Sequence, residues 1–351
     1  MVTQNSISVK RISKTLVLIL LAGTLLAGEA LAQQKRAQTS MKFLSTSMFA
    51  KGAGLADAMT SLEGNSSSLF YNPASMAWQQ SSLDLSLGMV TWIADINYNS
   101  AALSFAPSGG RYGVFGASFM YVDYGTLTET ILDGSESGYQ VLGEFGPYAY
   151  AFGLGYARAL SEQFSVGANA RYALQSLANG VVSIADNEMA RTDFEASTMT
   201  IDFGVFYKTG FESLNFAMVV RNFSPEVDYG AETESSELPL TFKMGLSMDL
   251  FDLTNVLNLT EVDRNNHSLL FSIDANRPRD FSEQLMFGVQ YGFLNRVFLR
   301  GGYAFPNDEQ GFSAGFGLRQ PFGNIGLEID YAYTTFGVFS EVNRYSLRFT
   351  F

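Results

Sequence analysis

The chain carries few side chains whose type and spacing suit catalysis or metal binding. Its one imidazole, His267, begins a predicted strand without a nucleophile elbow, which favours a solvated side chain over a Ser-His-Asp site. Acidic residues gather in two polar stretches whose spacing fits no known calcium loop: Asp133, Glu136, Glu144, Glu226, Asp228, Glu232, Glu234 and Glu237. We therefore expect no catalytic residue, no cofactor and no metal site, and we predict that the protein is not an enzyme.

Composition excludes further classes of function. The absence of cysteine rules out disulfides and thiolate metal sites. The formal net charge of -12 disfavours nucleic-acid binding, which needs clustered Lys and Arg. This acidic balance is compatible with acidic loops that face the outside of a cell, but it does not identify a partner.

The last nine residues alternate between apolar and polar side chains up to the final position. The apolar row is Tyr345, Leu347, Phe349 and Phe351, and polar residues separate its members. Such alternation places one row on each face of a strand. A closed barrel in lipid needs that pattern, with the apolar row toward the outer-membrane lipid. The stretch resembles the C-terminal signature by which the barrel assembly machinery recognises outer-membrane barrels; the alternative is an ordinary edge strand.

The same alternation recurs about fourteen times and predicts an all-β protein, a transmembrane antiparallel β-barrel of about 14 strands over residues 81–351. Short joints alternate with longer polar connections, as short periplasmic turns and long outer loops require. The long joint at 250–266 breaks this rule, so we expect either a short periplasmic helix there or an error in the strand count. The predicted strands are 81–90, 98–106, 111–123, 148–159, 164–175, 198–208, 213–221, 239–249, 267–276, 284–293, 296–305, 311–320, 324–334 and 343–351.

Two sets of side chains follow from this alternation. Aromatic residues near strand ends suit girdles at the two membrane interfaces, with plain β-propensity as the alternative: Tyr148, Tyr150, Tyr207, Tyr291, Phe293, Tyr303, Phe305, Tyr331 and Tyr333. Charged residues on the opposite face should pair across the lumen: Asp84, Arg111, Arg171, Asp202, Lys208, Arg221, Lys243, Asp249, Arg300, Arg319, Glu328, Asp330 and Arg348.

Residues 1–32 have the features of a signal peptide. Lys10, Arg11 and Lys14 precede the apolar stretch 15–27, and a small-x-small cleavage site ends at Ala32. A membrane anchor is the alternative, but about 13 apolar residues span only about 20 Å, short of the roughly 30 Å hydrocarbon core. We expect export from the cytoplasm and a mature chain that begins at Gln33.

Residues 33–80 do not alternate, and they carry the motif Gly52, Gly54 and Asp57 followed by Asn72, Pro73 and Ala74. Small residues allow close backbone packing, and Asn-Pro favours a turn. The segment resembles the start of the PorV/PorQ family, within the wider group of barrels similar to the fatty-acid transporter FadL. This resemblance implies an N-terminal hatch or plug inside the barrel; the alternative is a periplasmic tail.

Resemblance to the PorV/PorQ family implies a location in the bacterial outer membrane and a role in type IX secretion or surface attachment. The implied partners are a large secretion translocon and exported proteins. The alternative function is FadL-like transport of hydrophobic small molecules, which would make a hydrophobic ligand the partner. A structural porin-like protein is a third hypothesis. The mixed charge of the lumen slightly disfavours a transport path for hydrophobic molecules, so we prefer the secretion hypothesis.

Overall fold

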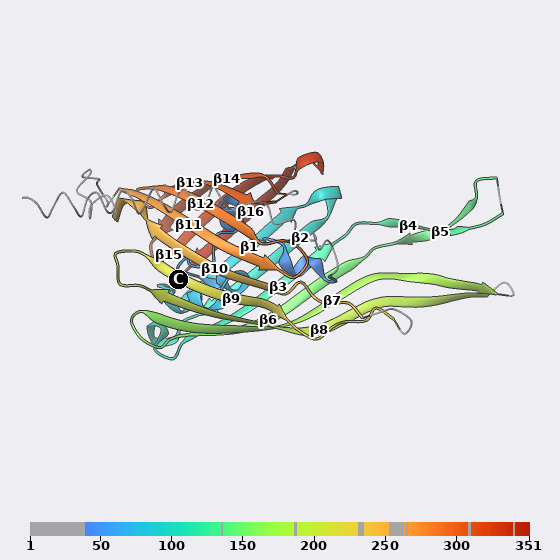
Figure 1. The fold of residues 1–351 in the computed structure, drawn as a ribbon, viewed down its shortest axis with the longest axis horizontal. Coiled ribbons are helices and arrows are strands. Elements are labelled where there is room, and N and C mark those ends of the chain that lie inside the picture. The colour runs from blue at the N-terminus through green and yellow to red at the C-terminus, as the bar shows by residue number, and fades with distance from the viewer. Residues whose placement is uncertain are drawn as a thin grey trace, which may run out of the picture. The chain divides into compact units, whose positions relative to one another are not determined.

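The computed structural model describes residues 39–351 except 135, 186–187, 231–234, 253–262, 264–265, 308–309 and 340. Its main feature is a closed barrel of 14 antiparallel strands, as the sequence predicts (Figure 1). The first strand pairs with the last, which closes the ring. The barrel strands are β1 (Leu83–Thr91), β2 (Asn97–Phe105), β3 (Val114–Asp123), β6 (Tyr148–Ala159), β7 (Phe164–Ala185), β8 (Glu188–Lys208), β9 (Asn215–Phe223), β10 (Thr241–Asp249), β11 (His267–Pro278), β12 (Gln284–Phe293), β13 (Val297–Phe305), β14 (Phe312–Phe322), β15 (Ile325–Thr335) and β16 (Glu341–Thr350).

The two faces of each strand differ as the alternation predicts. In β10, Lys243 and Ser247 are buried toward the lumen, whereas Phe242, Met244 and Leu246 are exposed on the outside. Exposed large apolar side chains recur on the other barrel strands. Lipid outside the wall explains this inversion of the usual arrangement, because a closed barrel satisfies every backbone group and can present apolar side chains to hydrocarbon.

The two ends of the barrel have different connections. At the turn end, which we define by Phe351 and the connections 106–113, 160–163, 209–214, 250–266, 294–296 and 323–324, most connections are short. The long joint at 250–266 begins with helical backbone at Leu250–Asp252, and most of the rest lies outside the described residues. The opposite end, which we call the hairpin end, carries the longer connections.

Two stretches expected to be polar loops, 125–147 and 176–197, instead contain strands. β4 (Leu127–Leu132) and β5 (Tyr139–Phe145) pair only with each other. β7 and β8 continue pairing beyond Ser176, where β7 leaves its other neighbour β6. The prediction missed them because neither stretch has a clear apolar face, whereas a hairpin can form through local backbone pairing. Figure 1 shows both hairpins running far past the barrel wall.

Residues 39–80, which we call the inner segment, lie inside the barrel. Their helices are η1 (Lys42–Ser45), α2 (Ala50–Gly54), η2 (Ser66–Phe70) and η3 (Pro73–Trp78). α2 contacts β13 to β16, η2 contacts β1 to β3, and η3 contacts β6 to β8. Three short helices lie in connections: η4 (Ile93–Asp95), η5 (Pro107–Gly110) and η6 (Gly337–Phe339).

The predicted signal peptide, 1–32, and the first residues of the predicted hatch, 33–38, lie outside the described residues. Within the described part of the chain, no helix combines the length and apolarity needed to cross a membrane.

The outward row of β10 provides a test of the lipid-facing surface. Leu246→Arg places a charge near the middle of that face and should lower the free energy of unfolding by about 2–4 kcal/mol. Leu160→Arg, at the turn end, should lower it by about 0–1 kcal/mol, because its side chain reaches the interface. Urea unfolding in lipid vesicles measures both, and equal losses would contradict the lipid-facing assignment.

Candidate functional site

The inner segment extends from one end of the lumen to the other. At the hairpin end, the Ser40 N–H donates to the Glu237 carbonyl at 2.9 Å, and the Thr39 hydroxyl donates to Asp280 at 2.8 Å. At the turn end, the Ser82 N–H donates to the carbonyl of Phe351 at 3.0 Å. Most side chains between these points are buried. The segment therefore fills space that would otherwise belong to a pore.

The first half of the predicted motif forms a close-packed turn. A Cβ on Gly54 would lie 3.2 Å from the Cα of Gly315 on β14, and one on Gly52 would lie 2.2 Å from the Tyr71 hydroxyl. Asp57 has a left-handed backbone, with φ of 62°, and its N–H donates to the Gly52 carbonyl at 2.8 Å. Small residues are therefore needed here because the barrel wall and Tyr71 approach the backbone closely.

The second half of the motif caps η3. Asn72 is fully buried, and its side-chain oxygen accepts from the Ala74 N–H at 3.1 Å. Its amide nitrogen donates to the carbonyl of Thr60 at 2.9 Å and to that of Val205 on β8 at 3.2 Å. Pro73 occupies the first helical position, where its missing N–H costs nothing. One side chain thus joins two parts of the inner segment to the wall.

Glycines in the wall make room for this turn. A Cβ on Gly167 of β7 would lie 2.6 Å from the Ala74 nitrogen, and one on Gly204 of β8 would lie 1.9 Å from the Asn72 side-chain oxygen. Both distances are shorter than non-bonded contacts allow. The structure therefore brings Asn72, Pro73 and Ala74 against two strands whose glycines the sequence analysis did not single out.

A buried ion-pair cluster lines the lumen wall beside α2. Glu328 lies 2.8 Å from Arg319, 3.3 Å from Arg348 and 3.6 Å from Arg300. Arg300 also pairs with Asp330 at 2.5 Å. These residues were all predicted to face the lumen, and they do. Fork-shaped guanidinium groups suit a carboxylate shared in this way.

Asp84 connects this cluster to the inner segment and to the seam between the first and last strands. Arg348 of β16 donates to Asp84 of β1 at 2.7 Å, and the same carboxylate accepts from the Ser66 N–H at 3.1 Å. The proposed assembly-signal residues lie in or just after β16, where Tyr345, Leu347 and Phe349 pair with β1 and the Phe351 N–H donates to Leu83. Their role in assembly stays a prediction.

Two charged residues of the wall that were not among the predicted lumen residues also bind the inner segment. Asp274 accepts from the Thr60 N–H at 3.0 Å and from its hydroxyl at 2.6 Å. Arg344 donates to the Ser47 carbonyl at 3.1 Å. Both residues follow the period-2 pattern of their strands, so strict alternation could have found them. Arg111, by contrast, is exposed in a turn, so its predicted lumen position was wrong.

Burial inside the barrel changes the ionisation of two groups of the inner segment. Desolvation lowers the pKa of Lys51 to about 8, with nearby Glu328 opposing the shift. Desolvation also raises the pKa of Tyr71, and the carboxylate of Asp57 adds to the rise. The desolvation of both groups agrees with their position inside the barrel.

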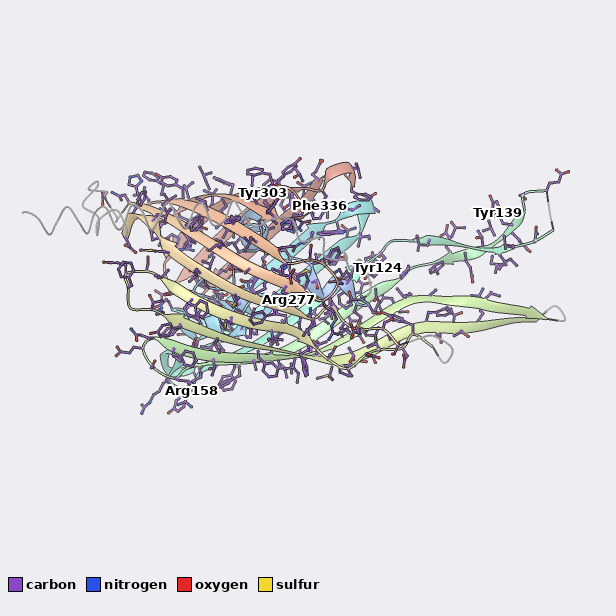
Figure 2. The ribbon with its side chains drawn as sticks, viewed as in Figure 1. Tyr124, Tyr139, Arg158, Arg277, Tyr303 and Phe336 are labelled. Atoms are coloured by element: carbon purple, nitrogen blue, oxygen red, sulfur yellow. The ribbon has the colours of Figure 1, made fainter. Side chains whose placement is uncertain are left out.

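Three connections meet at the base of the hairpin end. The Gln175 side chain donates to the Tyr124 hydroxyl at 2.9 Å and accepts from the Tyr229 hydroxyl at 2.7 Å. Farther out, Arg191 of β8 pairs with Glu129 of β4 at 2.9 Å, which links the two hairpins. Figure 2 labels Tyr124 near the barrel and Tyr139 on the projecting β5.

His267 is half-buried and hydrogen-bonded, although the sequence favoured a solvated side chain. Its Nδ1 lies 2.7 Å from the Tyr291 hydroxyl, and its ring packs against Phe293 with centroids 5.3 Å apart. Cross-strand pairing between β11 and β12, including His267 with Phe293, brings these rings together. The contacts are those of a packed aromatic cluster.

The close packing of Ala74 against Gly167 provides the first test of the site. Gly167→Val should prevent the turn at Ala74 from docking, so trypsin should cleave the inner segment at Lys42 and Lys51 faster than in the unaltered protein. Gly301→Val is the matched control, because a Cβ there meets nothing within 4 Å. Equal cleavage of both variants would show that the wall glycine does not hold the inner segment.

The lowered pKa of Lys51 predicts a pH dependence of stability. The folded pKa is about 8 and the ordinary value is 10.5, so the unfolded chain binds more protons between these values. Stability should therefore rise as pH increases through that window, and the penalty is present in full below about 8. Lys51→Met should flatten the dependence of the urea midpoint on pH. An unchanged slope would contradict the assignment.

Solved structures share this fold over most of their length. The structure resembles the CymD monoaromatic hydrocarbon channel with a TM-score of 0.56 and 13% identity, covering 87% of this chain and 97% of that one. The toluene transporter TodX of Pseudomonas putida gives 0.52 and 12%, with 85% and 95% covered. A FadL homologue of Pseudomonas aeruginosa gives 0.50 and 12%, with 90% and 99% covered. At such identities the likeness shows a FadL-like barrel fold and not a shared function.

No curated protein matches the chain. A family model matches residues 66–345, and its description is type IX secretion system membrane protein PorP/SprF. The expected membership of the PorV/PorQ family was therefore wrong. The residues that suggested it form a helix cap and close-packed glycines in this structure. The barrel lies in the bacterial outer membrane, and the chain belongs to the PorP/SprF family of type IX secretion system membrane proteins.

Proposed function

We propose that this protein is a non-enzymatic docking component of the type IX secretion system, which binds a translocon component or an exported protein through its hairpin end. The observation that carries the proposal is the combination of a lumen occupied by the inner segment with two hairpins that project from one end. A filled barrel is suited to anchoring, and projecting strands with unpaired edges are suited to binding.

The inner segment acts as the hatch of this barrel. Its contacts come from strands around the wall: Asp84 on β1, Asp274 on β11 and Arg344 on β16 each bind it. Removing it would take hydrogen-bond partners away from each of these buried charged groups, and a lost hydrogen bond to a buried charged group is costly. The segment is therefore a permanent part of the folded barrel and not a loosely held lid.

The hairpin end faces the cell exterior. Outer-membrane barrels place short turns in the periplasm and long connections outside, and the turn end carries most of the short connections. The strongly acidic connections at the hairpin end agree with this orientation, since residues 124–147 contain four acidic and no basic residues.

The β4–β5 hairpin presents the features of a protein-binding surface. Among the described residues, β4 and β5 pair only with each other, so each has an edge that can accept another strand. Large apolar side chains stand exposed on it: Leu132 is 92% accessible, Val141 55% and Tyr139 52%. Exposed apolar groups on a projecting ribbon favour a protein partner over a small solute.

Transport of hydrophobic small molecules is the second candidate, and one observation favours it. The fold is that of channels described as carrying monoaromatic hydrocarbons and toluene. The lumen wall of this protein is lined by charged and polar side chains such as Arg171, Asp202 and Lys243, which are all buried. Charged groups such as the Arg171–Asp202 ion pair, at 2.8 Å, make a poor path for an apolar solute, so we prefer docking.

Replacement of residues 127–145 by a short Gly-Ser turn tests the docking role. Gentle detergent extraction should recover the unaltered protein with a larger outer-membrane or exported partner, and the variant should lose that partner while the barrel stays folded. Phe211→Ser, an exposed apolar residue at the turn end, is the control and should retain it. Recovery as a lone monomer with a bound hydrocarbon or fatty acid would support transport instead.

A further inference from the structure

Two arginines stand directly opposite each other at the turn end. Val297 of β13 pairs with Leu318 of β14, and one step beyond, the Arg319 N–H donates to the Arg296 carbonyl at 2.7 Å. This hydrogen bond places Arg296 and Arg319 opposite each other at the rim of the barrel. Like charges at directly opposite positions repel each other, so this pair needs an anion nearby to be favourable.

The protein neutralises only one of the two guanidinium groups. Arg319 pairs with Glu328 at 2.8 Å, and that carboxylate is already shared with Arg300 and Arg348. Arg296 donates to the Gln320 side chain at 3.2 Å. Over the part of the chain that the structure describes, no carboxylate forms an ion pair with Arg296. Positive charge is therefore in excess at this point of the rim.

A cavity of about 390 Å³ opens beside the pair, between the β12–β13 and β14–β15 turns. Asn295, Asn324 and Thr350 add polar side chains to its lining, and neither Asp nor Glu is among the described residues that line it. Asn295 accepts from Arg319 at 2.9 Å, which fixes the guanidinium at the cavity edge. The lining thus combines two cationic groups with neutral polar groups, and Glu328, which binds Arg319, is not among the lining residues.

The apolar part of the lining indicates where a ligand would extend. Leu294 and Ile325 line the same cavity and are exposed on the outside of the barrel rim. Next to them, Phe322 and Phe293 are exposed near the strand ends, in the position of an interfacial aromatic girdle. A polar pocket that merges with an apolar, lipid-facing edge suits a molecule with an anionic headgroup and an apolar chain.

We propose that Arg296 and Arg319 bind a phosphate group, and that the phospholipid headgroup of the leaflet at the turn end supplies it. The Arg296 guanidinium presents parallel N–H donors that match phosphate oxygens, and Arg319, whose Nε and Nη2 already donate to Glu328, adds its positive charge beside them. The acyl chains then lie along Leu294 and Ile325. The site is independent of the docking role, since it lies at the other end of the barrel.

Arg296→Gln tests this site, because it removes the unpaired cation and leaves the Glu328 cluster intact. The delipidated protein in neutral detergent is titrated with dihexanoyl phosphatidylglycerol and, separately, with inorganic phosphate, and binding is followed by native mass spectrometry and calorimetry. The variant should weaken lipid binding at least about tenfold, the loss expected for charge-assisted hydrogen bonds. Arg158→Gln is the matched control, an exposed arginine at the same end in another sector (Figure 2), and should bind as the unaltered protein does.

The two probes separate the sources of phosphate. Tighter binding of the lipid assigns the site to a phospholipid, whereas equal binding of both probes supports the phosphate site and overturns its assignment to lipid. Absence of binding, or equal affinities of Arg296→Gln and the unaltered protein, overturns the site itself. Heat-modified migration in gels checks that each variant is folded. Arg296→Lys keeps the positive charge but lacks the paired N–H donors of a guanidinium group, so it should give an intermediate affinity.

Discussion

The inward face of this barrel has to find polar partners inside a closed wall. Lipid outside accepts apolar side chains on the outer face, and much of the inward face carries buried polar or charged groups. Buried polar groups without partners are costly. The inner segment supplies many of these partners: backbone groups at Thr60, Ser47 and Ala50 bind Asp274, Arg344 and Ser346. Barrel and inner segment are therefore one folding unit.

The fold could be predicted because its main signal is local. Period-2 alternation is readable within each strand, and β6, β12 and β15 lie within one residue of their predicted bounds. The β4–β5 hairpin and the outer halves of β7 and β8 could not be predicted in this way. Both faces of such ribbons meet water, so no alternation marks them, and their pairing depends on the two strands finding each other.

The site was predictable only in part, for a different reason. Asn72 and Pro73 are recognisable as a turn and a helix cap from neighbouring residues. Their partners on the wall, Val205 and Gly167, are distant in sequence, and Val205 is 133 residues from Asn72. A single sequence does not show which strand a turn will contact. The motif reports local packing in this chain, and the family follows from the family model that matches residues 66–345.

The inner segment also constrains how this barrel could work. Glu328 is shared by three arginines, and Asp84 joins one of them to Ser66 of the inner segment. Displacing the segment would break contacts to several strands together, because the groups form a connected set. A hydrogen bond between a buried charged group and the segment typically contributes about 1.5–3 kcal/mol, so opening the lumen would require several such bonds to break together. A barrel filled in this way supports the proposed anchoring role, in which the hairpins extend beyond the wall.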